Sequence, residues 1–345
     1  MASRAAAFVT ESWYTGAFWL YLLLPFTLLY HVITLIRKFC YRAGIFSSYR
    51  SCLPVIVVGN ITVGGTGKSP LVACLVGSLR EQGYTPGIVS RGYGSNIGPG
   101  DVREVHVSSL VSDVGDEPLM LKRALACSVM VSPSRALAVQ ALERTGCDIV
   151  IADDGLQHYA LARDIEICVI DGVRQWGNGW MLPMGPLRES LAKINTLDFI
   201  VVNGVGRDGV DWRDRSPNDV IRMDLDPGAL RSISLDGKDE MALENLKASK
   251  VNAVAAIGHP ERFFSTLQQH GLQLERHVFE DHHLFSPEDF RFSNDLPIIM
   301  TEKDAVKCRE LDLENAWYLP VSARLSGDLG AQIIKSLKTK GWFDG

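Results

Sequence analysis

Short apolar segments alternate with amphipathic ones over most of this chain. Continuous apolar runs rich in β-branched residues recur at 54–60, 87–90, 129–132, 148–153, 165–171 and 198–203. Segments with the apolar spacing of helices lie between several of them, at 69–83, 117–126 and 134–146. A continuous apolar run is typical of a strand that is buried on both faces. The pattern therefore predicts an α/β fold in which right-handed βαβ units form a doubly wound parallel sheet.

A second, shorter series of the same kind follows. It contains expected strands at 251–258, 272–279 and 297–300 and expected helices at 260–271 and 302–311. We place a domain boundary near residue 225, which gives a larger domain over 38–225 and a smaller α/β domain over 226–345.

The region around this boundary is polar and contains a turn sequence. Residues 204–217 are rich in Gly, Asp and Arg, which favours a surface loop. The segments 220–225 and 231–235 flank a turn signal at Asp226, Pro227 and Gly228. We therefore expect these two segments to pair as a two-stranded connector between the domains.

The N-terminal region contains one long apolar segment. Residues 17–36 carry no formal charge over 20 positions, about the length that crosses a bilayer as a helix. Basic residues follow this segment at Arg37, Lys38, Arg42 and Arg50, whereas only Arg4 precedes it. This bias predicts that residues 1–37 form a membrane-associated helix and that the rest of the chain is cytoplasmic. A buried core helix is the alternative, because Pro25 and His31 are costly in lipid, and the pattern leaves open whether the helix spans the membrane or lies in its interface.

Composition narrows the function classes. The chain has 345 residues, of which 46% are hydrophobic and 22% charged, as in a folded globular protein. The net charge of −5 excludes a general nucleic-acid binder. The seven cysteines contain no CxxC pair, which favours reduced thiols over a zinc site or a disulfide framework.

A glycine-rich sequence, GNITVGGTGKSP, occupies residues 59–70 between an expected strand and an expected helix. Its end matches the GK[ST] of a phosphate loop, in which backbone N–H groups surround phosphate oxygens. Lys68 is expected to reach the β- and γ-phosphates of ATP, and Ser69 to hold Mg²⁺. The expected nucleotide-binding residues are Thr62, Val63, Gly64, Gly65, Thr66, Gly67, Lys68 and Ser69. Thr62 stands where the strict pattern has its first glycine, and the alternative is an ordinary glycine-rich turn.

Two adjacent carboxylates end another expected strand. Residues 148–154 read DIVIADD, which fits the strand that supplies a Mg²⁺ ligand in phosphate-loop nucleotidases. Either Asp153 or Asp154 is expected to face the metal. The alternative is that both acids only solvate a loop.

Several short motifs resemble one family when they are taken in order. They are GNITVGGTGKSP (59–70), SRGYG (90–94), GDEP (115–118), DDGLQH (153–158), GPLRE (185–189), DHH (281–283) and TEKDAVK (301–307). Together with the N-terminal apolar helix they resemble the tetraacyldisaccharide 4′-kinases of Gram-negative bacteria. The resemblance implies transfer of the γ-phosphoryl group of ATP to the 4′-hydroxyl of a tetraacylated glucosamine disaccharide 1-phosphate, forming lipid IVA. It also implies a site on the cytoplasmic face of the inner membrane, and two α/β/α domains joined by a short two-stranded linker.

The resemblance also assigns roles to individual residues. Asp116 in GDEP matches the catalytic base of the family, although its position also suits a helix cap. His282 in DHH matches the histidine that partners this base, with His283 as the alternative. Further matched site residues are Arg135, Arg188 and Glu189; the arginines suit phosphate contacts. His259 stands where the resemblance leads us to expect Asn, and Glu117, Gln157 and His158 are weaker candidates.

One other function class stays open at this point. A membrane-associated ATPase switch with a deviant phosphate loop also carries a GGxGK[ST] sequence. Such a switch has a signature lysine at the position of Val63, and it has no need of the GDEP carboxylate. Both differences favour the kinase.

Overall fold

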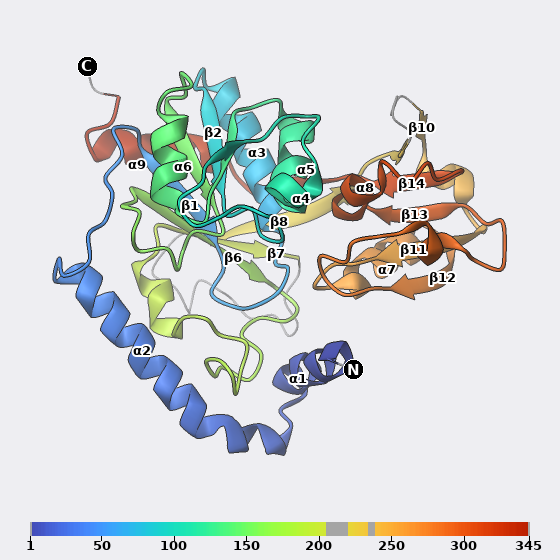
Figure 1. The fold of residues 1–345 in the computed structure, drawn as a ribbon, viewed down its shortest axis with the longest axis horizontal. Coiled ribbons are helices and arrows are strands. Elements are labelled where there is room, and N and C mark those ends of the chain that lie inside the picture. The colour runs from blue at the N-terminus through green and yellow to red at the C-terminus, as the bar shows by residue number, and fades with distance from the viewer. Residues whose placement is uncertain (1, 205–219, 234–238, 344–345) are drawn as a thin grey trace.

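The computed structural model of the protein describes residues 2–204, 220–233 and 239–343, so nearly all of the expected loop at 204–217 lies outside the described residues. Two lobes are visible in Figure 1, each built on its own sheet. Among the described residues, the sheet of the core lobe has nine strands in the order β15-β8-β7-β6-β1-β5-β2-β4-β3, and that of the second lobe has six in the order β10-β9-β14-β13-β11-β12.

The core sheet confirms the predicted doubly wound arrangement. Its centre is β1 (Val55–Gly59), which pairs in parallel with β5 (Ile149–Asp153) and β6 (Ile165–Asp171). The parallel part continues through β2 (Pro86–Ser90), β4 (Val129–Val131) and β7 (Phe199–Asn203). The short β3 (Arg103–Glu104) closes one edge in the antiparallel direction.

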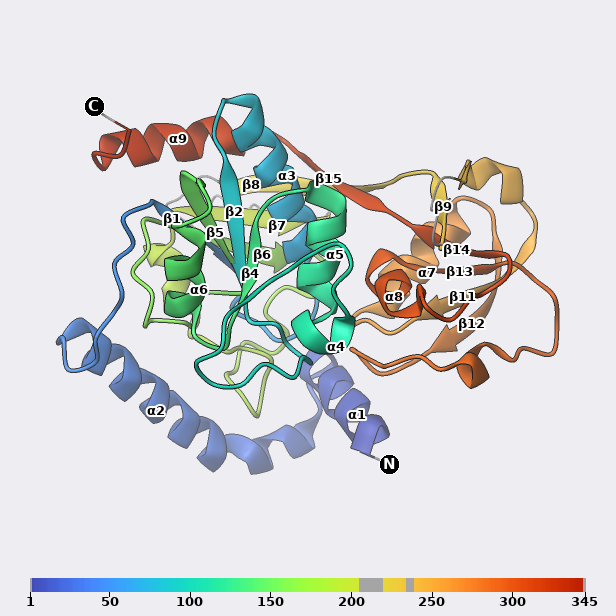
Figure 2. The ribbon, with the colours of Figure 1, turned by 45° about the horizontal axis from the view of Figure 1, so that its top comes forward.

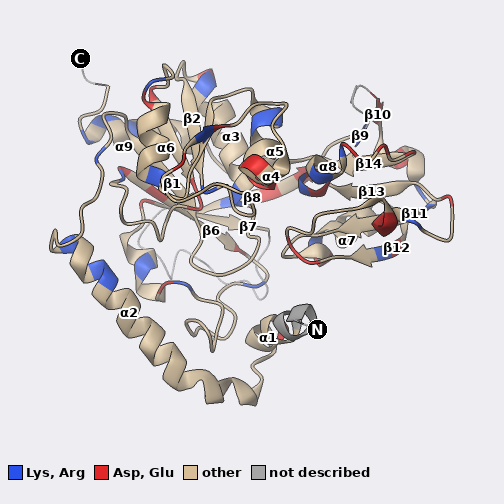
Figure 3. Ribbon diagram, in the orientation of Figure 1, with Lys and Arg blue, Asp and Glu red and all other residues tan. Residues whose placement is uncertain are grey.

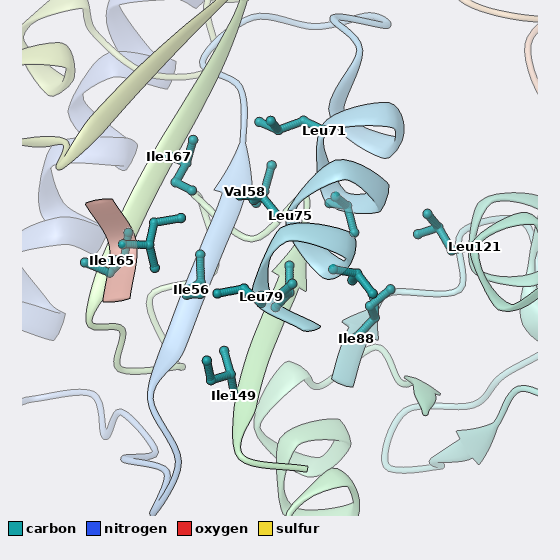
Figure 4. Close-up of a cluster of buried hydrophobic side chains, with 14 of the residues drawn as sticks. Ile56, Val58, Leu71, Leu75, Leu79, Ile88, Leu121, Ile149, Ile165 and Ile167 are labelled. Atoms are coloured by element: carbon teal, nitrogen blue, oxygen red, sulfur yellow. The ribbon is translucent and has the colours of Figure 1, made fainter. Parts of the chain in front are cut away.

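Helices cover both faces of this sheet, as continuous apolar strands require. Alternate residues of β1 enter different clusters: Ile56 and Val58 pack with α3 (Lys68–Glu81), whereas Val55 and Val57 pack with α6 (Arg135–Leu142). Figure 4 shows the first cluster, in which α3 contributes Leu71, Leu75 and Leu79. Two further helices on this lobe are α4 (Val111–Val114) and α5 (Asp116–Leu125), and a 3₁₀ turn is η2 (Leu191–Thr196).

The second lobe contains the predicted second α/β series. Its parallel strands are β11 (Lys250–Ala255), β12 (Gln273–Val278), β13 (Ile298–Thr301) and β14 (Ala316–Leu319). Antiparallel β9 (Leu230–Ser232) and β10 (Glu240–Met241) extend one edge. The helices are α7 (Pro260–Gln269) and α8 (Glu302–Cys308), with 3₁₀ turns η5 (Leu243–Leu246) and η6 (Pro287–Phe290).

The expected pairing of 220–225 with 231–235 is wrong. Strand β8 (Val220–Pro227) runs through the expected turn position and pairs with β15 (Val321–Leu325), while β9 pairs with β14 and β10. The chain therefore crosses between the lobes along β8 and returns along β15. A turn sequence is a local signal, and here a partner almost one hundred residues away replaces the local hairpin.

The C-terminal segment belongs to the core lobe. Helix α9 (Leu329–Thr339) follows β15 and places Leu329, Ile333 and Leu337 in the same buried cluster as α3. Figure 2 shows α9 beside the first sheet, far from the strands of the second lobe. The domain division at residue 225 stays a prediction, but the range 226–345 contains elements of both sheets.

The N-terminal segment forms helices that lie along the edge of the core lobe (Figure 1). They are α1 (Ala2–Thr15), the 3₁₀ turn η1 (Phe18–Leu23) and α2 (Leu24–Arg42), with Pro25 in the first turn of α2, where its missing N–H costs nothing. Phe18–Arg42 is long and apolar enough to cross a membrane by length and composition, and only 11% of its most apolar window is buried. The alternative of a buried core helix therefore does not hold. Figure 3 shows α2 free of charge except near its C-terminal end.

Candidate active site

A cavity of about 940 Å³ lies between the two lobes, at the carboxyl ends of the central parallel strands. This edge is where open α/β sheets bind their ligands. The core lobe contributes the glycine-rich loop, the ends of β2 and β5 and the start of α5. The second lobe contributes residues 257–259, 281–282 and 301–303. Arg37, in the C-terminal half of α2, also lines the cavity, so the apolar N-terminal helix contributes a side chain to this site.

The glycine-rich loop faces the cavity with residues 64–69. Gly67 has φ +95°, and a Cβ atom there would lie 2.3 Å from Nδ2 of Asn203. That amide donates to the carbonyl oxygen of Thr66 at 2.8 Å, so this position requires glycine. Thr62 and Val63 lie at the base of the loop instead: Thr62 bridges to Leu187 and Val63 packs against the α1 cluster. Because α3 begins at Lys68, its N-terminal N–H groups point toward the loop, as in phosphate sites.

The cations expected around phosphate are gathered next to Asp154. The Nζ atom of Lys68 lies 3.5 Å from Oδ1 of Asp154, and Nη1 of Arg188 lies 3.1 Å from Oδ2. Burial would raise the pKa of Asp154, but the charges of Lys68 and Arg188 outweigh it and lower this pKa. Asp154 therefore stays ionised and holds both cations near the loop.

Asp153 has a different environment, although it is the next residue. Its side chain is 1% exposed, and Oδ1 has no hydrogen-bond partner among the described residues. Burial, followed by the charge of Glu117, raises the pKa of Asp153 to about 7. A buried carboxylate oxygen without a partner is suited to a cation, and Mg²⁺ in nucleotide sites uses only one or two protein carboxylates. The structure thus fits Mg²⁺ at Asp153, although no group of three or more His, Cys, Asp or Glu in the described ranges forms a metal cluster.

Of the other expected site residues, Arg135 reaches the cavity and Glu189 does not. Arg135 is 4% exposed and donates to the backbone oxygens of Asp153 and Asp154 at 3.2 and 3.3 Å. It therefore holds the end of β5 in place. Glu189 is also buried, but it pairs with Lys38 of α2 and accepts from the hydroxyl of Tyr159. Gln157 and His158 line the cavity.

Asp116 and His282 meet across the cavity from different lobes. Nδ1 of His282 lies 2.8 Å from Oδ2 of Asp116, while Oδ1 of Asp116 accepts from the backbone N–H of Glu117 at 2.8 Å. Thus Oδ2 makes the contact between the lobes, and Oδ1 accepts a hydrogen bond at the start of α5. His283 instead pairs with Asp289 at 3.1 Å. Between the two histidines, the structure brings His282 to Asp116.

The contact shifts both pKa values. Burial would raise the pKa of Asp116, but the hydrogen bond from His282 and the charge of Lys303 lower it. Burial would lower the pKa of His282, but the hydrogen bond to Asp116 raises it. An ionised carboxylate that an imidazole holds in one orientation can act as a general base toward a hydroxyl group.

Lys303 is a site residue that sequence reasoning missed. Its Nζ atom lies 3.2 Å from Oε1 of Glu117 and 3.1 Å from Oδ1 of Asp281, in contact with the same dyad. The motif TEKDAVK contains this lysine, but nothing local to that motif relates it to GDEP.

A second interlobe contact lies on the other side of the cavity. Nδ1 of His259 is 3.7 Å from Oδ2 of the buried Asp171, and Arg262 donates to the backbone oxygen of Asn203 at 3.1 Å. Burial would raise the pKa of Asp171, but His259 and the N–H of Arg174 lower it to about 2. The lobes are therefore joined by polar contacts on both sides of the cavity.

The comparisons with known proteins agree with this geometry. The sequence profile described as Tetraacyldisaccharide-1-P 4′-kinase matches residues 19–338. The tetraacyldisaccharide 4′-kinase of Aeromonas hydrophila is 46% identical over 333 residues, covering 95% of this chain and 96% of that protein. The enzyme of the same name from Methylobacillus flagellatus is 41% identical, covering 98% of each chain.

A solved structure is similar as well. The crystal structure of LpxK from Aquifex aeolicus in complex with ATP superposes with a TM-score of 0.74 at 27% identity, covering 93% of this chain and 98% of that one. The profile match alone spans most of the chain, and the relatives match it almost end to end. The chain therefore belongs to the tetraacyldisaccharide 4′-kinase family.

Proposed function

We propose that this chain is a kinase that transfers the γ-phosphoryl group of ATP to the 4′-hydroxyl of a tetraacyldisaccharide 1-phosphate, forming lipid IVA. Family membership supports the reaction, and one observation carries the mechanism. In a single cavity, an ionised carboxylate paired with an imidazole faces a phosphate loop with its lysine. A sugar hydroxyl needs a base, and a phosphoryl group in transfer needs positive charge around it.

Each residue of the site has its own role in the proposed reaction. The N–H groups of the loop and Lys68 hold the β- and γ-phosphates, and Arg188 adds a second cation at the transferred group. Asp116 accepts the proton of the sugar hydroxyl through Oδ2, and His282 fixes the direction of that oxygen. Arg135 holds the backbone of Asp153 and Asp154 in position.

Mg²⁺ is expected to bind at Asp153 and Ser69, with Asp154 turned toward the cations instead. When bound, the metal neutralises charge that develops on the phosphates.

We further propose that the enzyme acts at the cytoplasmic face of the inner membrane. The apolar face of α2 is exposed, and its basic C-terminal end reaches the cavity through Arg37. A lipid substrate in the membrane would present its sugar headgroup at that level.

The test is incubation with γ-labelled ATP, Mg²⁺ and vesicles that contain tetraacyldisaccharide 1-phosphate. We expect label in the lipid, dependent on both Mg²⁺ and the disaccharide. If label appears only as free phosphate, and at the same rate with vesicles that lack the disaccharide, the result would contradict the kinase and favour the ATPase switch.

A further inference from the structure

Lys303 lies at the start of α8 and reaches from the second lobe to the core lobe. Its side chain is 14% exposed. Within the described residues, Nζ contacts Oε1 of Glu117 at 3.2 Å, Oδ1 of Asp281 at 3.1 Å and Nε2 of His282 at 3.5 Å, and it lies 3.7 Å from Oδ2 of Asp116. A single ammonium group thus contacts both members of the dyad and two further carboxylates.

The hydrogen bonds of this ammonium group are all used inside the protein. Lysine has three N–H donors, and Glu117, Asp281 and His282 take one each. None is left to bind a phosphate oxygen. Lys303 therefore differs from Lys68, although both residues line the same cavity.

The contact with His282 also favours one position for the proton of the imidazole. An ammonium group can only donate, so the neutral ring accepts at Nε2 and carries its proton on Nδ1, the atom that faces Asp116. The ionised Asp116 at Nδ1 favours the same tautomer, so the carboxylate and the lysine together hold this proton on Nδ1.

The charges near Asp116 give the second effect of Lys303. Glu117 on α5 and Asp281 beside His282 are both carboxylates, and repulsion among three such groups favours protonation of one of them. The nearest other cation on α8 is Lys307, and it is paired with the buried Asp304. Tyr93 packs its neutral ring on His282 and adds no charge.

We propose that Lys303 is a positioning residue for phosphoryl transfer: it joins the lobes at the dyad, supports the tautomer of His282 that donates to Asp116, and offsets the negative charge of the carboxylates around Asp116. This inference rests on the proposed function, because it gives the lysine a role in positioning the catalytic base and no role in binding ATP. Lys303 acts on the reaction only through Asp116 and His282.

The test compares Lys303→Met, Lys303→Arg and the control Lys335→Met, which removes an exposed lysine of α9. Lipid labelling is followed from about pH 5 to 9. Lys303→Met is expected to lower kcat by roughly 10- to 100-fold, with the KM for ATP within about threefold. In the plot of kcat against pH, the acidic limb of Lys303→Met should also move to higher pH, because Asp116 loses a neighbouring cation. Lys303→Arg should keep the limb near its original position, and Lys335→Met should match the wild type.

Other results would overturn the inference. A raised KM for ATP with unchanged kcat would make Lys303 a phosphate ligand, and an acidic limb that does not move would leave it a merely structural contact. If Lys303→Met does not fold, Lys303→Gln gives the same reading, because it removes the charge and keeps a polar end. Failure of the proposed function can be distinguished from failure of this inference, because the wild type itself would then label no lipid.

Discussion

Nδ1 of His282 lies 2.8 Å from Oδ2 of Asp116, although 166 residues separate the two along the chain. The aspartate starts a helix of the core lobe, and the histidine follows the last residues of β12 in the second lobe. His282 has a positive φ of 63°, which non-glycine residues seldom adopt. A strained backbone that is retained at such a contact agrees with a functional role for it.

Replacing Lys68 by alanine is expected to remove transfer and leave the fold intact. The side chain lines the cavity, and its contacts among the described residues are long, at 3.4 Å to Asn60 and 3.5 Å to Asp154, so we expect the fold to survive its loss. We expect kcat to fall by about 10²-fold or more, since this charge meets the phosphates in the transition state. Single-turnover labelling measures the loss, and circular dichroism confirms the fold. Activity within about threefold of the wild type would contradict the phosphate-loop assignment.

The pH dependence of stability should report the charge on His282. Its pKa is raised above the ordinary 6.5, so the charged form adds stability that is fully present below pH 6.5 and is lost as pH rises through the higher folded pKa. The pKa of Asp116 is lowered from 3.8, so its contribution is lost as pH falls below that value. The difference in unfolding free energy between the wild type and His282→Gln should therefore be largest between these limits and decline toward alkaline pH.

Urea unfolding at a series of pH values measures this difference. His283→Gln is the matched control, because the neighbouring histidine pairs with Asp289 and not with the core lobe. The series runs from pH 5 to 9 in steps of about one unit. If the difference in unfolding free energy between the wild type and His282→Gln stays constant over this range, the result would count against a charged interlobe pair.

Charges on the exposed face of α2 should impair use of the lipid more than use of ATP. Leu29 and Ile33 are 58% and 55% exposed, so their replacement by aspartate removes little internal packing. Burial of an aspartate at membrane depth costs about 2.5–3.5 kcal/mol. We expect Leu29→Asp with Ile33→Asp to release the protein from vesicles and to raise the apparent KM for vesicle-bound lipid, with the KM for ATP unchanged. Equal binding to vesicles by flotation would show that this face does not contact the membrane.

Glu189→Gln is expected to lower stability and to leave ATP binding unchanged. The carboxylate is 1% exposed and pairs with Lys38, so the substitution removes the charge partner that joins α2 to the core lobe. Removing one member of a buried pair costs on the order of 3–5 kcal/mol, less here because Lys38 is partly exposed. Thermal unfolding and the KM for ATP are the two measurements. An unchanged melting temperature together with a large loss of kcat would place Glu189 in the chemistry, as the family resemblance implies.

Much of the core lobe could be predicted from the sequence because its signals are local. The apolar runs of β1 and β5 identify buried parallel strands, and the carboxyl ends of such strands meet at one edge of the sheet. The phosphate loop after β1 and the two aspartates after β5 therefore had to be neighbours.

The interlobe features were less accessible to sequence reasoning. The pairing of β8 with β15 joins segments about one hundred residues apart, and α9 packs on α3 across about 250 residues. Periodicity does not identify partners at either separation. Lys303 meets Glu117 for the same reason, across 186 residues. Family resemblance gave His282, but the choice against His283 needed the geometry of the loop.

The most direct test of the account is kcat for lipid phosphorylation by Asp116→Asn, Asp116→Ala, His282→Ala and the double alanine variant, with His283→Ala as control. If Asp116 is the base and His282 acts through it, both Asp116 variants should lose about 10²-fold or more, and His282→Ala somewhat less. The double variant should be little worse than Asp116→Ala, since residues that act as one unit are not additive. Near-wild-type turnover by Asp116→Asn, or losses that multiply in the double variant, would contradict the dyad.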